Sequence, residues 1–223
     1  RRVGLLMRVL VVGARSGSLG EAVAEVMGAR VGFDQVVTAG PTNEEQSLDL
    51  SDPSLWDDLD SIQNICGRFT HVVCTAGINE GARVEEARFD AAMHQSFQAN
   101  TMGPLLLLQW FLEQEPPLYH KGLRHFVAIS SNSAHIARRG SAPYCASKAA
   151  LSMALRVVAR EQAGNDVNIY GYEPGWIDGT PMSESVAGLF AGNFHRIPGG
   201  KGVRVEDLAG MRFHEGVRIS LVC

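Results

Sequence analysis

The chain has 223 residues, of which 45% are hydrophobic and 20% are charged, proportions that are typical of a packed globular domain. This composition excludes a disordered, collagen-like or coiled-coil protein. The formal net charge of −4 argues against a nucleic-acid partner. No hydrophobic run reaches the ~18 residues of a membrane span, so a membrane partner is not expected either.

The spacing of the cysteines and histidines predicts neither disulfides nor a metal site. No Cys-x-x-Cys pair occurs, and reduced thiols in a cytoplasmic protein fit this pattern better than a disulfide framework. The seven histidines show no His-Glu-x-x-His or mixed His/Cys spacing, so no metal is expected. The four cysteines are Cys66, Cys74, Cys145 and Cys223.

The N-terminal residues share one feature with a signal peptide. Two arginines precede an apolar run from Val3 to Val12, but Arg8 interrupts the run and a glycine-rich turn follows it. We therefore expect a cytoplasmic protein. Met7 is expected to be the natural start, with residues 1–6 as an added extension.

Short apolar runs alternate with longer helical patterns along the chain. In chain order, the sequence predicts a strand over 7–12, a helix over 18–28, strands over 34–39 and 47–50, a helix over 52–66, a strand over 71–75, a helix over 90–113, a strand over 125–130, a helix over 144–163 and a strand over 167–172. The third of these helices is the longest.

Strands that are apolar on both faces and are separated by helices indicate a parallel sheet covered on both sides. The expected fold is a single α/β domain over residues 1–223, with a Rossmann-like doubly wound sheet of six to seven strands. Residues 181–202 are rich in Gly and Ser, and we expect them to form a mobile flap over a substrate.

A glycine-rich turn joins the first expected strand to the first helix. It reads Gly13-Ala14-Arg15-Ser16-Gly17-Ser18-Leu19-Gly20. Glycines at such a turn let a pyrophosphate approach the backbone, and the N-terminus of the next helix offers N–H groups to it. The turn alone leaves a dinucleotide site and an ordinary strand–helix turn equally open.

Two further motifs fit proton-transfer chemistry. Tyr144 and Lys148 are four residues apart in a predicted helix, so they share one face. An ammonium group beside a phenol favours the phenolate and lowers the phenol pKa; the alternative is a solvated lysine beside a half-buried tyrosine. Ser130 and Ser131 end a predicted strand, where a parallel sheet binds ligands, although paired serines are also common in turns.

With these motifs in this order, the chain resembles the short-chain dehydrogenase/reductase family. The resemblance covers residues 7–180 and extends more faintly to Ala209. Further matches are Asp49 after the third predicted strand, Ala76-Gly77 after the fourth, Asn100 followed by Gly103 in the long helix, and Pro174-Gly175-Trp176-Ile177-Asp178-Gly179-Thr180 after the sixth strand.

The resemblance implies an NAD(P)-dependent oxidoreductase that interconverts a secondary alcohol and a ketone. Tyr144 would be the general acid or base, and Lys148 would lower the Tyr144 pKa and bind the nicotinamide ribose. Ser131 would hold the substrate oxygen. Asn100 would kink its helix and hold a water that passes protons to Lys148. The cofactor itself supplies the hydride chemistry.

The resemblance also implies which residues border the cofactor. The glycine turn would hold the pyrophosphate, Asp49 and Leu50 would border the adenine, and the stretch from Pro174 to Thr180 would cover the nicotinamide. The full expected set is Gly13, Arg15, Ser16, Gly17, Leu19, Gly20, Asp49, Leu50, Ala76, Gly77, Tyr144, Lys148, Pro174, Gly175, Ile177 and Thr180.

The partners that the resemblance implies are a small-molecule carbonyl or alcohol and further copies of the chain. A homodimer or homotetramer would form through the helices that contain Asn100 and Tyr144. Residues 105–112 make the first of these helices apolar nearly all round, which predicts burial on two sides. Burial under the chain's own loops is the alternative.

The cofactor preference follows from a departure from the family pattern. An acid after the second strand would select NAD, but Ala39-Gly40-Pro41-Thr42-Asn43 stands there. Arg15 in the glycine turn is able to pair with a 2′-phosphate. We therefore favour NADP, with NAD as the alternative.

Other departures leave further functions open. The third glycine of the turn comes one position later than usual, the helix expected between Gly40 and Gln46 is missing, and the short C-terminus ends in a predicted seventh strand over 217–222. An extended-branch epimerase or dehydratase and a non-catalytic dinucleotide sensor are the alternatives. Arg138 and Arg139 are expected to be a solvated loop pair, with a role toward an acidic substrate as the alternative.

Overall fold

A computed structural model describes residues 7–31, 33–41, 46–52, 54–116, 123–178, 180–183 and 203–204. Its strands are β1 (Arg8–Val12), β2 (Gln35–Ala39), β3 (His71–Cys74), β4 (Arg124–Ile129), β5 (Val167–Tyr172), β6 (Ile177–Asp178) and β7 (Val203–Arg204). Its α-helices are α1 (Leu19–Val26), α2 (Leu55–Cys66), α3 (Phe89–Phe97), α4 (Gly103–Glu113) and α5 (Ala142–Glu161).

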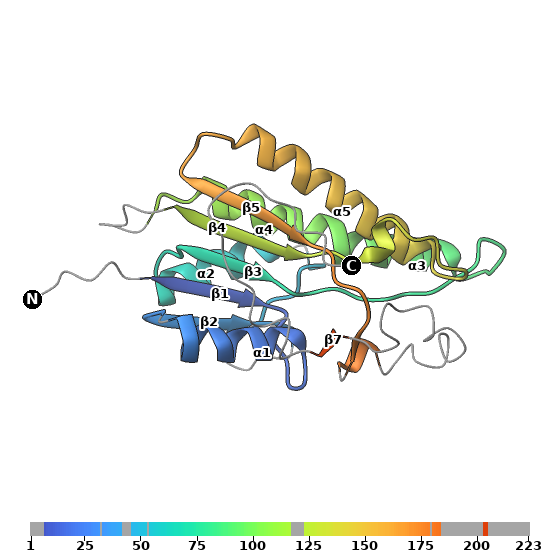
Figure 1. Cartoon of the computed structure of the whole chain (residues 1–223), viewed down its shortest axis with the longest axis horizontal. Coiled ribbons are helices and arrows are strands. Elements are labelled where there is room, and N and C mark those ends of the chain that lie inside the picture. The colour runs from blue at the N-terminus through green and yellow to red at the C-terminus, as the bar shows by residue number, and fades with distance from the viewer. Residues whose placement is uncertain are drawn as a thin grey trace, which may run out of the picture.

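Five strands form one parallel sheet in the order β2-β1-β3-β4-β5 (Figure 1). The chain runs from β1 to β2 at one edge and then crosses to the other side of β1 to form β3. The strand order therefore reverses beside β1, and the crevice outside the carboxyl ends of the strands at such a point binds ligands in α/β proteins. Strands β6 and β7 pair in a separate two-stranded sheet.

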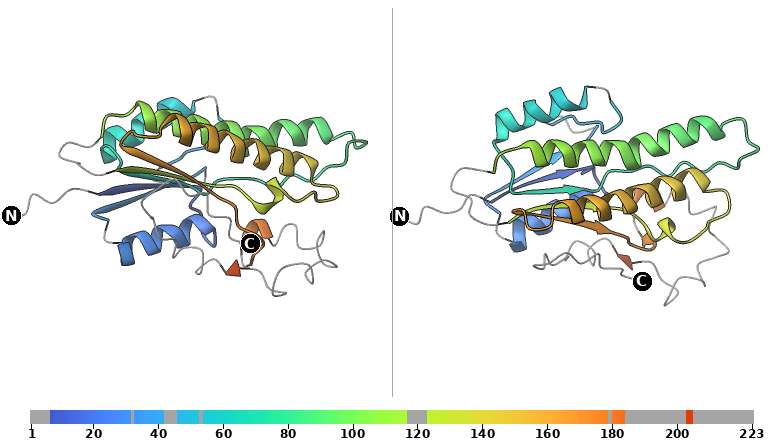
Figure 2. Two further views of the ribbon diagram at one scale, coloured as in Figure 1. Left: turned by 45° about the horizontal axis from the view of Figure 1, so that its top comes forward. Right: turned by 90° about the horizontal axis from the view of Figure 1, so that it is seen from above.

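Helices cover both faces of the main sheet, as the sequence predicts. Figure 2 shows α2, α3, α4 and α5 on one face and α1 on the other. Phe126 of β4 shares the first core layer with Leu59 of α2 and Leu155 of α5. Val11 of β1 shares the second layer with Val23 of α1. The fold is therefore a doubly wound α/β domain.

The strand predicted over 47–50 is wrong, and the main sheet has five described strands instead of six or seven. Only an isolated bridge between Gly40 and Ser47 forms in that segment. Leu48 and Leu50 are nevertheless buried, so a loop that packs inward produces the same alternation of apolar and polar residues. The seventh strand predicted over 217–222 lies outside the described residues, as does most of the predicted flap.

Two predicted helices differ in detail from the observed ones. The helix predicted to start at Asp52 starts at Leu55, and the Asp52 carboxylate accepts a 2.7 Å hydrogen bond from the Ser54 N–H in the preceding turn. The long helix predicted over 90–113 consists of α3 and α4 with a π-helical turn, Gln98–Met102, directly between them. Such turns often mark functional sites.

The start of α4 packs unusually closely on the loop after β2. A Cβ atom at Gly103 would collide with the carbonyl oxygen of Leu50, so only glycine allows this approach. Farther along α4, the side chains of Trp110 and Phe111 are fully buried in the core.

Among the helices of the described segments, none combines the length and the apolar character that crossing a membrane requires.

Candidate active site

A cavity of about 470 Å³ lies at the carboxyl ends of the parallel strands. Residues that follow β1, β3, β4 and β5 form its wall, together with the first turns of α5. Parallel strands bring these loops to the same edge of the sheet. Residues as far apart in sequence as Gly13 and Trp176 therefore border one cavity.

Most of the predicted site residues line this cavity. They are Gly13, Arg15, Leu19, Asp49, Leu50, Ala76, Gly77, Ser131, Tyr144, Lys148, Pro174, Gly175, Ile177 and Thr180. Four predicted residues, Ser16, Gly17, Gly20 and Asn100, are not part of its wall. Ser16 and Gly17 are exposed in the glycine turn, whereas Gly20 and Asn100 are buried behind the wall.

Two glycines bring the turn after β1 against the segment after β3. Gly13 has a φ of 92°, and a Cβ atom there would lie 2.5 Å from the backbone nitrogen of Ala76. A Cβ atom at Gly20 would lie 2.6 Å from Oγ1 of Thr75. Both positions therefore need glycine, and the displaced third glycine still serves close packing of helix and strand.

The side chains of Ser18 and Glu21 hold the glycine turn in place. Ser18 caps α1, and its Oγ accepts hydrogen bonds from the N–H groups of Glu21 (3.3 Å) and Arg15 (3.0 Å). Glu21 reaches back, and its Oε2 accepts a 2.7 Å hydrogen bond from the N–H of Gly17. This is close to a capping box, and it places a carboxylate beside the helix N-terminus where a phosphate would be favoured.

At the side of the cavity near β2, the predicted adenine border is a structured turn. Oδ1 of Asp49 accepts hydrogen bonds from the N–H (2.9 Å) and the Oγ (2.6 Å) of Ser51. Gly40 and Pro41, which follow β2, line the cavity beside it. Gly40 and Pro41 carry no acidic group, so Asp49 is the acidic side chain that this side of the cavity presents among the described residues.

Tyr144 and Ser131 meet in the cavity wall. Tyr144 lies in the first turn of α5 and is 9% exposed. Burial raises the pKa of the Tyr144 phenol, while a hydrogen bond with Ser131 and the positive charge of Arg138 lower it to a smaller extent. The Tyr144 pKa is therefore raised in this structure, whereas the sequence predicts that Lys148 lowers it.

Lys148 lies one turn after Tyr144 on α5 and is buried. Its Nζ donates a 2.9 Å hydrogen bond to the carbonyl oxygen of Ile129 at the end of β4, and lies 6.0 Å from the centre of the Tyr144 ring. Burial lowers the pKa of Lys148 to about 8. A Cβ atom at Gly77 would lie 3.2 Å from this Nζ, so the ammonium group faces the backbone after β3.

Asn100 sits at the centre of the π-helical turn, fully buried. Its Oδ1 accepts a 2.8 Å hydrogen bond from the N–H of Ile78, and its Nδ2 donates to the Ile78 carbonyl (2.9 Å) and to Oγ of Ser147 (3.0 Å). Asn100 thereby joins the segment after β3 to α5. It sets the distance between Gly77 and Lys148.

The segment after β5 is tied to the loop after β4. The carbonyl oxygen of Pro174 accepts a 3.0 Å hydrogen bond from the N–H of Asn132. Thr180 is buried, and its Oγ1 accepts a 3.1 Å hydrogen bond from the N–H of Ser183. The segment from Pro174, predicted to cover the nicotinamide, is therefore held at its first residue by a backbone hydrogen bond to Asn132, the neighbour of Ser131.

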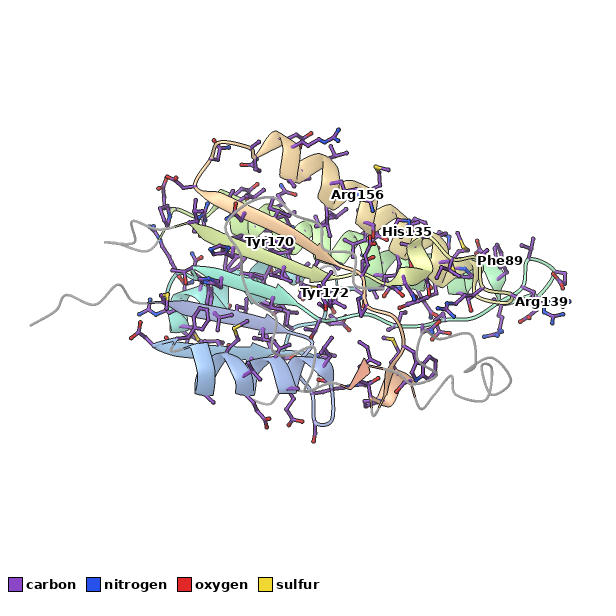
Figure 3. All side chains as sticks on the ribbon, in the orientation of Figure 1. Phe89, His135, Arg139, Arg156, Tyr170 and Tyr172 are labelled. Carbon is purple, nitrogen blue, oxygen red and sulfur yellow. The ribbon has the colours of Figure 1, made fainter. Side chains whose placement is uncertain are left out.

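Arg138 differs from the solvated loop residue that the sequence predicts. It lines the cavity, and its Nε and Nη2 donate hydrogen bonds to Oγ of Ser133 (2.9 Å) and Oδ1 of Asn132 (3.0 Å). Arg139 is exposed, and Figure 3 shows it at the outer end of the molecule. No pattern in the sequence separates these two arginines, because the difference depends on contacts with the turn after β4.

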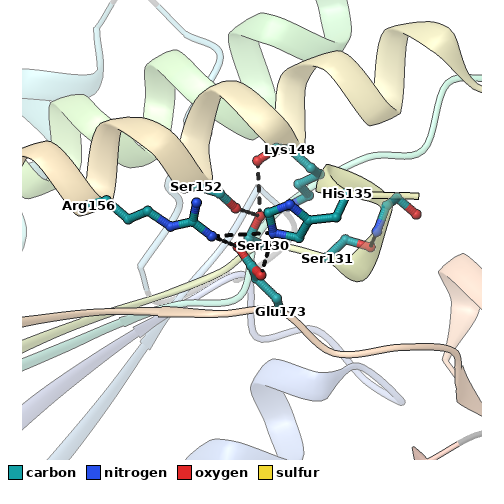
Figure 4. A network of polar contacts seen from close by, with 8 residues as sticks. Ser130, Ser131, His135, Lys148, Ser152, Arg156 and Glu173 are labelled. Atoms are coloured by element: carbon teal, nitrogen blue, oxygen red, sulfur yellow. Dashed lines mark hydrogen bonds and ion pairs between the residues drawn. The ribbon is translucent and has the colours of Figure 1, made fainter. Parts of the chain in front are cut away.

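A charged cluster that sequence reasoning missed lies behind the loop after β5 (Figure 4). Glu173 is 2% exposed, and its carboxylate contacts Nε2 of His135 at 2.9 Å and Nη2 of Arg156 at 3.5 Å. His135 follows the short 3-10 helix Asn132–Ala134, and Arg156 lies on α5. Glu173, which directly precedes Pro174, thus joins the end of β5 to α5 and to the residue after the 3-10 helix.

The described residues form a cradle that fits a dinucleotide. Within the described ranges, no group of three His, Cys, Asp or Glu side chains is placed to hold a metal ion. The close backbone approach at Gly13 is the cradle that a pyrophosphate uses, and the N-terminus of α1 opens toward it. The same cavity wall continues to Tyr144 and Lys148.

The family model described as short chain dehydrogenase matches residues 7–188. The chain belongs to the short-chain dehydrogenase/reductase family. Two relatives agree with this assignment. The acetoacetyl-CoA reductase of Synechocystis sp. is 28% identical over 79% of this chain and 74% of its own length. The D-erythrulose reductase of Gallus gallus is 29% identical over 90% of this chain and 84% of its own length.

Solved structures of this family share the fold. The 3-oxoacyl-[acyl-carrier protein] reductase from Brucella melitensis, solved in complex with NAD, superimposes with a TM-score of 0.80 and 20% identity, covering 92% of this chain and 88% of that one. A short-chain type dehydrogenase/reductase from Mycobacterium marinum gives 0.79 and 24% over 92% and 85% of the two chains. The short-chain dehydrogenase/reductase assignment makes the chain an oxidoreductase of Rossmann-like fold.

Proposed function

We propose that the protein uses NADP to interconvert a small ketone and the corresponding secondary alcohol. The observation that carries this proposal is the shared wall of one cavity, in which Ser131, Tyr144 and Lys148 lie beside the glycine turn and Gly77. A site for dinucleotide binding alone does not need a buried phenol next to a serine hydroxyl. The presence of both supports catalysis.

The glycine turn, Asp49 and Ala76 would hold the cofactor, with Lys148 toward its ribose and Pro174 over its nicotinamide. When bound, the cofactor supplies the hydride that reduces the carbonyl carbon. NADP is favoured because exposed Arg15 lines the cavity and because Gly40 and Pro41, which directly follow β2, carry no acidic group to repel a 2′-phosphate. The NAD complex of the Brucella melitensis relative keeps NAD as the alternative.

Tyr144 would deliver the proton of the reduction. Its phenol is protonated at neutral pH, and burial raises its pKa further. It therefore donates to the substrate oxygen while the Ser131 hydroxyl orients that oxygen. The resulting phenolate would share the cavity with the positively charged Arg138. The proton returns through Lys148 and the Asn100 region, and the reverse sequence oxidises an alcohol.

We also propose that the protein is a cytoplasmic homodimer. Met102 at the start of α4 and Met153 and Val157 on α5 are exposed apolar side chains. These are the two helices through which the sequence predicts self-association, and burying such a face stabilises a dimer. The free thiols of Cys66, Cys74 and Cys145 are consistent with a reducing compartment.

The test is a spectrophotometric assay of purified protein with NADPH or NADH and a panel of ketones and hydroxyketones. Tyr144→Phe should lower kcat by roughly 10²- to 10⁴-fold, the contribution of general acid catalysis. Tyr172→Phe on β5 is the matched control, because Tyr172 packs against the α1 layer and is not part of the cavity wall.

Undiminished turnover in Tyr144→Phe would refute the mechanism. Cofactor binding without turnover would indicate a sensor, and NAD that copurifies would indicate an epimerase or dehydratase.

A further inference from the structure

The guanidinium group of Arg138 is a fixed cation in the cavity wall. Hydrogen bonds to Ser133 (2.9 Å) and Asn132 (3.0 Å) hold it on the turn after β4, and the Ser141 N–H donates to the Arg138 carbonyl (3.1 Å) at the start of α5. Both flanking elements carry site residues, since the first follows Ser131 and the second contains Tyr144. The charge is therefore positioned by the same elements that position the proton donor.

The charge of Arg138 also acts at the reacting end of the cavity. Its positive charge lowers the pKa of the Tyr144 phenol, against the larger opposing effect of burial. Arg138, Ser131 and Tyr144 also line the same cavity. A substrate whose oxygen is held by Tyr144 and Ser131 would therefore share that cavity with the guanidinium group.

We propose that Arg138 binds a carboxylate on the substrate, so that the enzyme prefers oxo acids and hydroxy acids to neutral ketones and alcohols. This inference rests on the proposed carbonyl reductase function and names its substrate class. A planar guanidinium group held in one orientation suits a carboxylate, with which it forms strong charge-assisted hydrogen bonds.

Among the described residues, two acids also line the cavity, and neither cancels this preference. The Asp49 carboxylate is engaged by Ser51 at the predicted adenine border. Glu80 lies in the segment between β3 and α3, and among the described residues it forms neither an ion pair with Arg138 nor a side-chain hydrogen bond. Its unrestrained side chain is able to turn away from an anion, whereas the guanidinium group of Arg138 is held in place.

The test compares acids with their amides, which match them in size and lack the charge. Pyruvate, acetoacetate and levulinate are each assayed beside pyruvamide, acetoacetamide and levulinamide with NADPH, and kcat/KM is measured. Wild-type protein should prefer at least one acid to its amide. Arg138→Gln should reduce that preference by roughly 10- to 100-fold, the range lost with a hydrogen bond to a charged group.

Two further variants separate binding from a structural effect. Arg139→Gln removes the adjacent exposed charge and should leave the acid-to-amide ratio unchanged. Arg138→Lys keeps the charge without the planar geometry and should restore part of the preference.

The other possible results distinguish a wrong role for Arg138 from a wrong function for the protein. Equal rates on acids and amides in the wild type, or equal losses on both in Arg138→Gln and Arg138→Lys, would overturn the assignment of Arg138 while leaving the reductase intact. Absence of turnover on these compounds and on the whole carbonyl panel would instead refute the proposed function on which the assignment depends.

Discussion

The ammonium nitrogen of Lys148 lies 2.9 Å from the carbonyl oxygen of Ile129, and this hydrogen bond holds a buried charge at the end of β4. Burial makes the charge costly, which is why the pKa of Lys148 falls to about 8. The lysine therefore changes its protonation state close to physiological pH. Any role it has in orienting a ribose or returning a proton depends on pH in that region.

The first prediction concerns stability. Between the folded pKa of about 8 and the ordinary value of 10.5, the unfolded chain keeps a proton on this lysine that the folded protein has released. The Lys148 contribution therefore makes the unfolding free energy rise with pH through this window. Lys148→Met should remove this rise, as measured by urea unfolding of both proteins at several pH values up to ~9.5, since the cysteines and tyrosines that titrate in this range are common to both. An equal slope in both proteins would contradict the buried charge.

Asn100 should be needed for stability as well as for activity. Asn100→Ala leaves the N–H and carbonyl of Ile78 without their side-chain partners, at a cost of about 1–3 kcal/mol for each buried polar group. Thermal unfolding measures the loss. Asn165→Ala is the control, since Asn165 is exposed and bonds only to Gln162 within the described chain. An unchanged Tm in Asn100→Ala would show that the π-helical turn does not depend on this amide.

Glu21 should weaken cofactor binding by its charge. Glu21→Gln keeps an oxygen that accepts from the Gly17 N–H but removes a negative charge beside the predicted pyrophosphate position. The cofactor KM should fall by roughly 2- to 5-fold, the effect of one partly screened charge pair. The difference between the two proteins should shrink in high salt. A rise in KM at all salt concentrations would mean that the carboxylate is needed to shape the turn.

Glu173 should hold the segment before Pro174 in place. Glu173→Gln keeps the shape but removes the buried charge that faces the partly exposed Arg156 and His135, which should cost about 1 kcal/mol because solvent screens the two partners. Chemical denaturation measures this, and the cofactor KM should rise in parallel. Glu161→Gln at the exposed end of α5 serves as the control and should change neither quantity.

Arg15 should set the cofactor preference. Arg15→Gln should lower the ratio of kcat/KM for NADPH to that for NADH by roughly 10-fold, because a guanidinium–phosphate contact of about 1.4 kcal/mol is lost. Steady-state kinetics with both cofactors measures the ratio. If Arg15→Gln affected both cofactors equally, the residue would contact a group that they share, and the preference for NADP would need another source.

The layered fold was predictable because its signals are local. The strand predicted over 71–75 matches β3 to within one residue, since a run of residues buried on both faces has few alternatives. The strand predicted over 47–50 failed because Leu48 and Leu50 alternate with polar residues in an inward-packing loop as they would in a strand. Pairing, which defines a strand, depends on a neighbour that the local pattern does not contain.

The candidate site was predictable to the extent that motif order determines it. Residues at the ends of parallel strands must converge, so Gly13, Ser131 and Tyr144 could be placed together from the sequence. Arg138 and Glu173 could not, because their environments arise from contacts with the turn after β4 and with α5. A charged residue in a loop gives no local signal of whether water or another side chain surrounds it.

The absence of a side chain at the first residue of α4 has a consequence for evolution of the site. Gly103 packs on the backbone of Leu50, so the loop proposed to border adenine rests directly on the helix that follows the π-helical turn of Asn100. A methyl group at Gly103 would push the loop and the helix apart, so it would displace the proposed adenine border and Asn100 together. If both proposals hold, cofactor binding and proton transfer depend on the same small spacing, and a change at Gly103 would alter the two together.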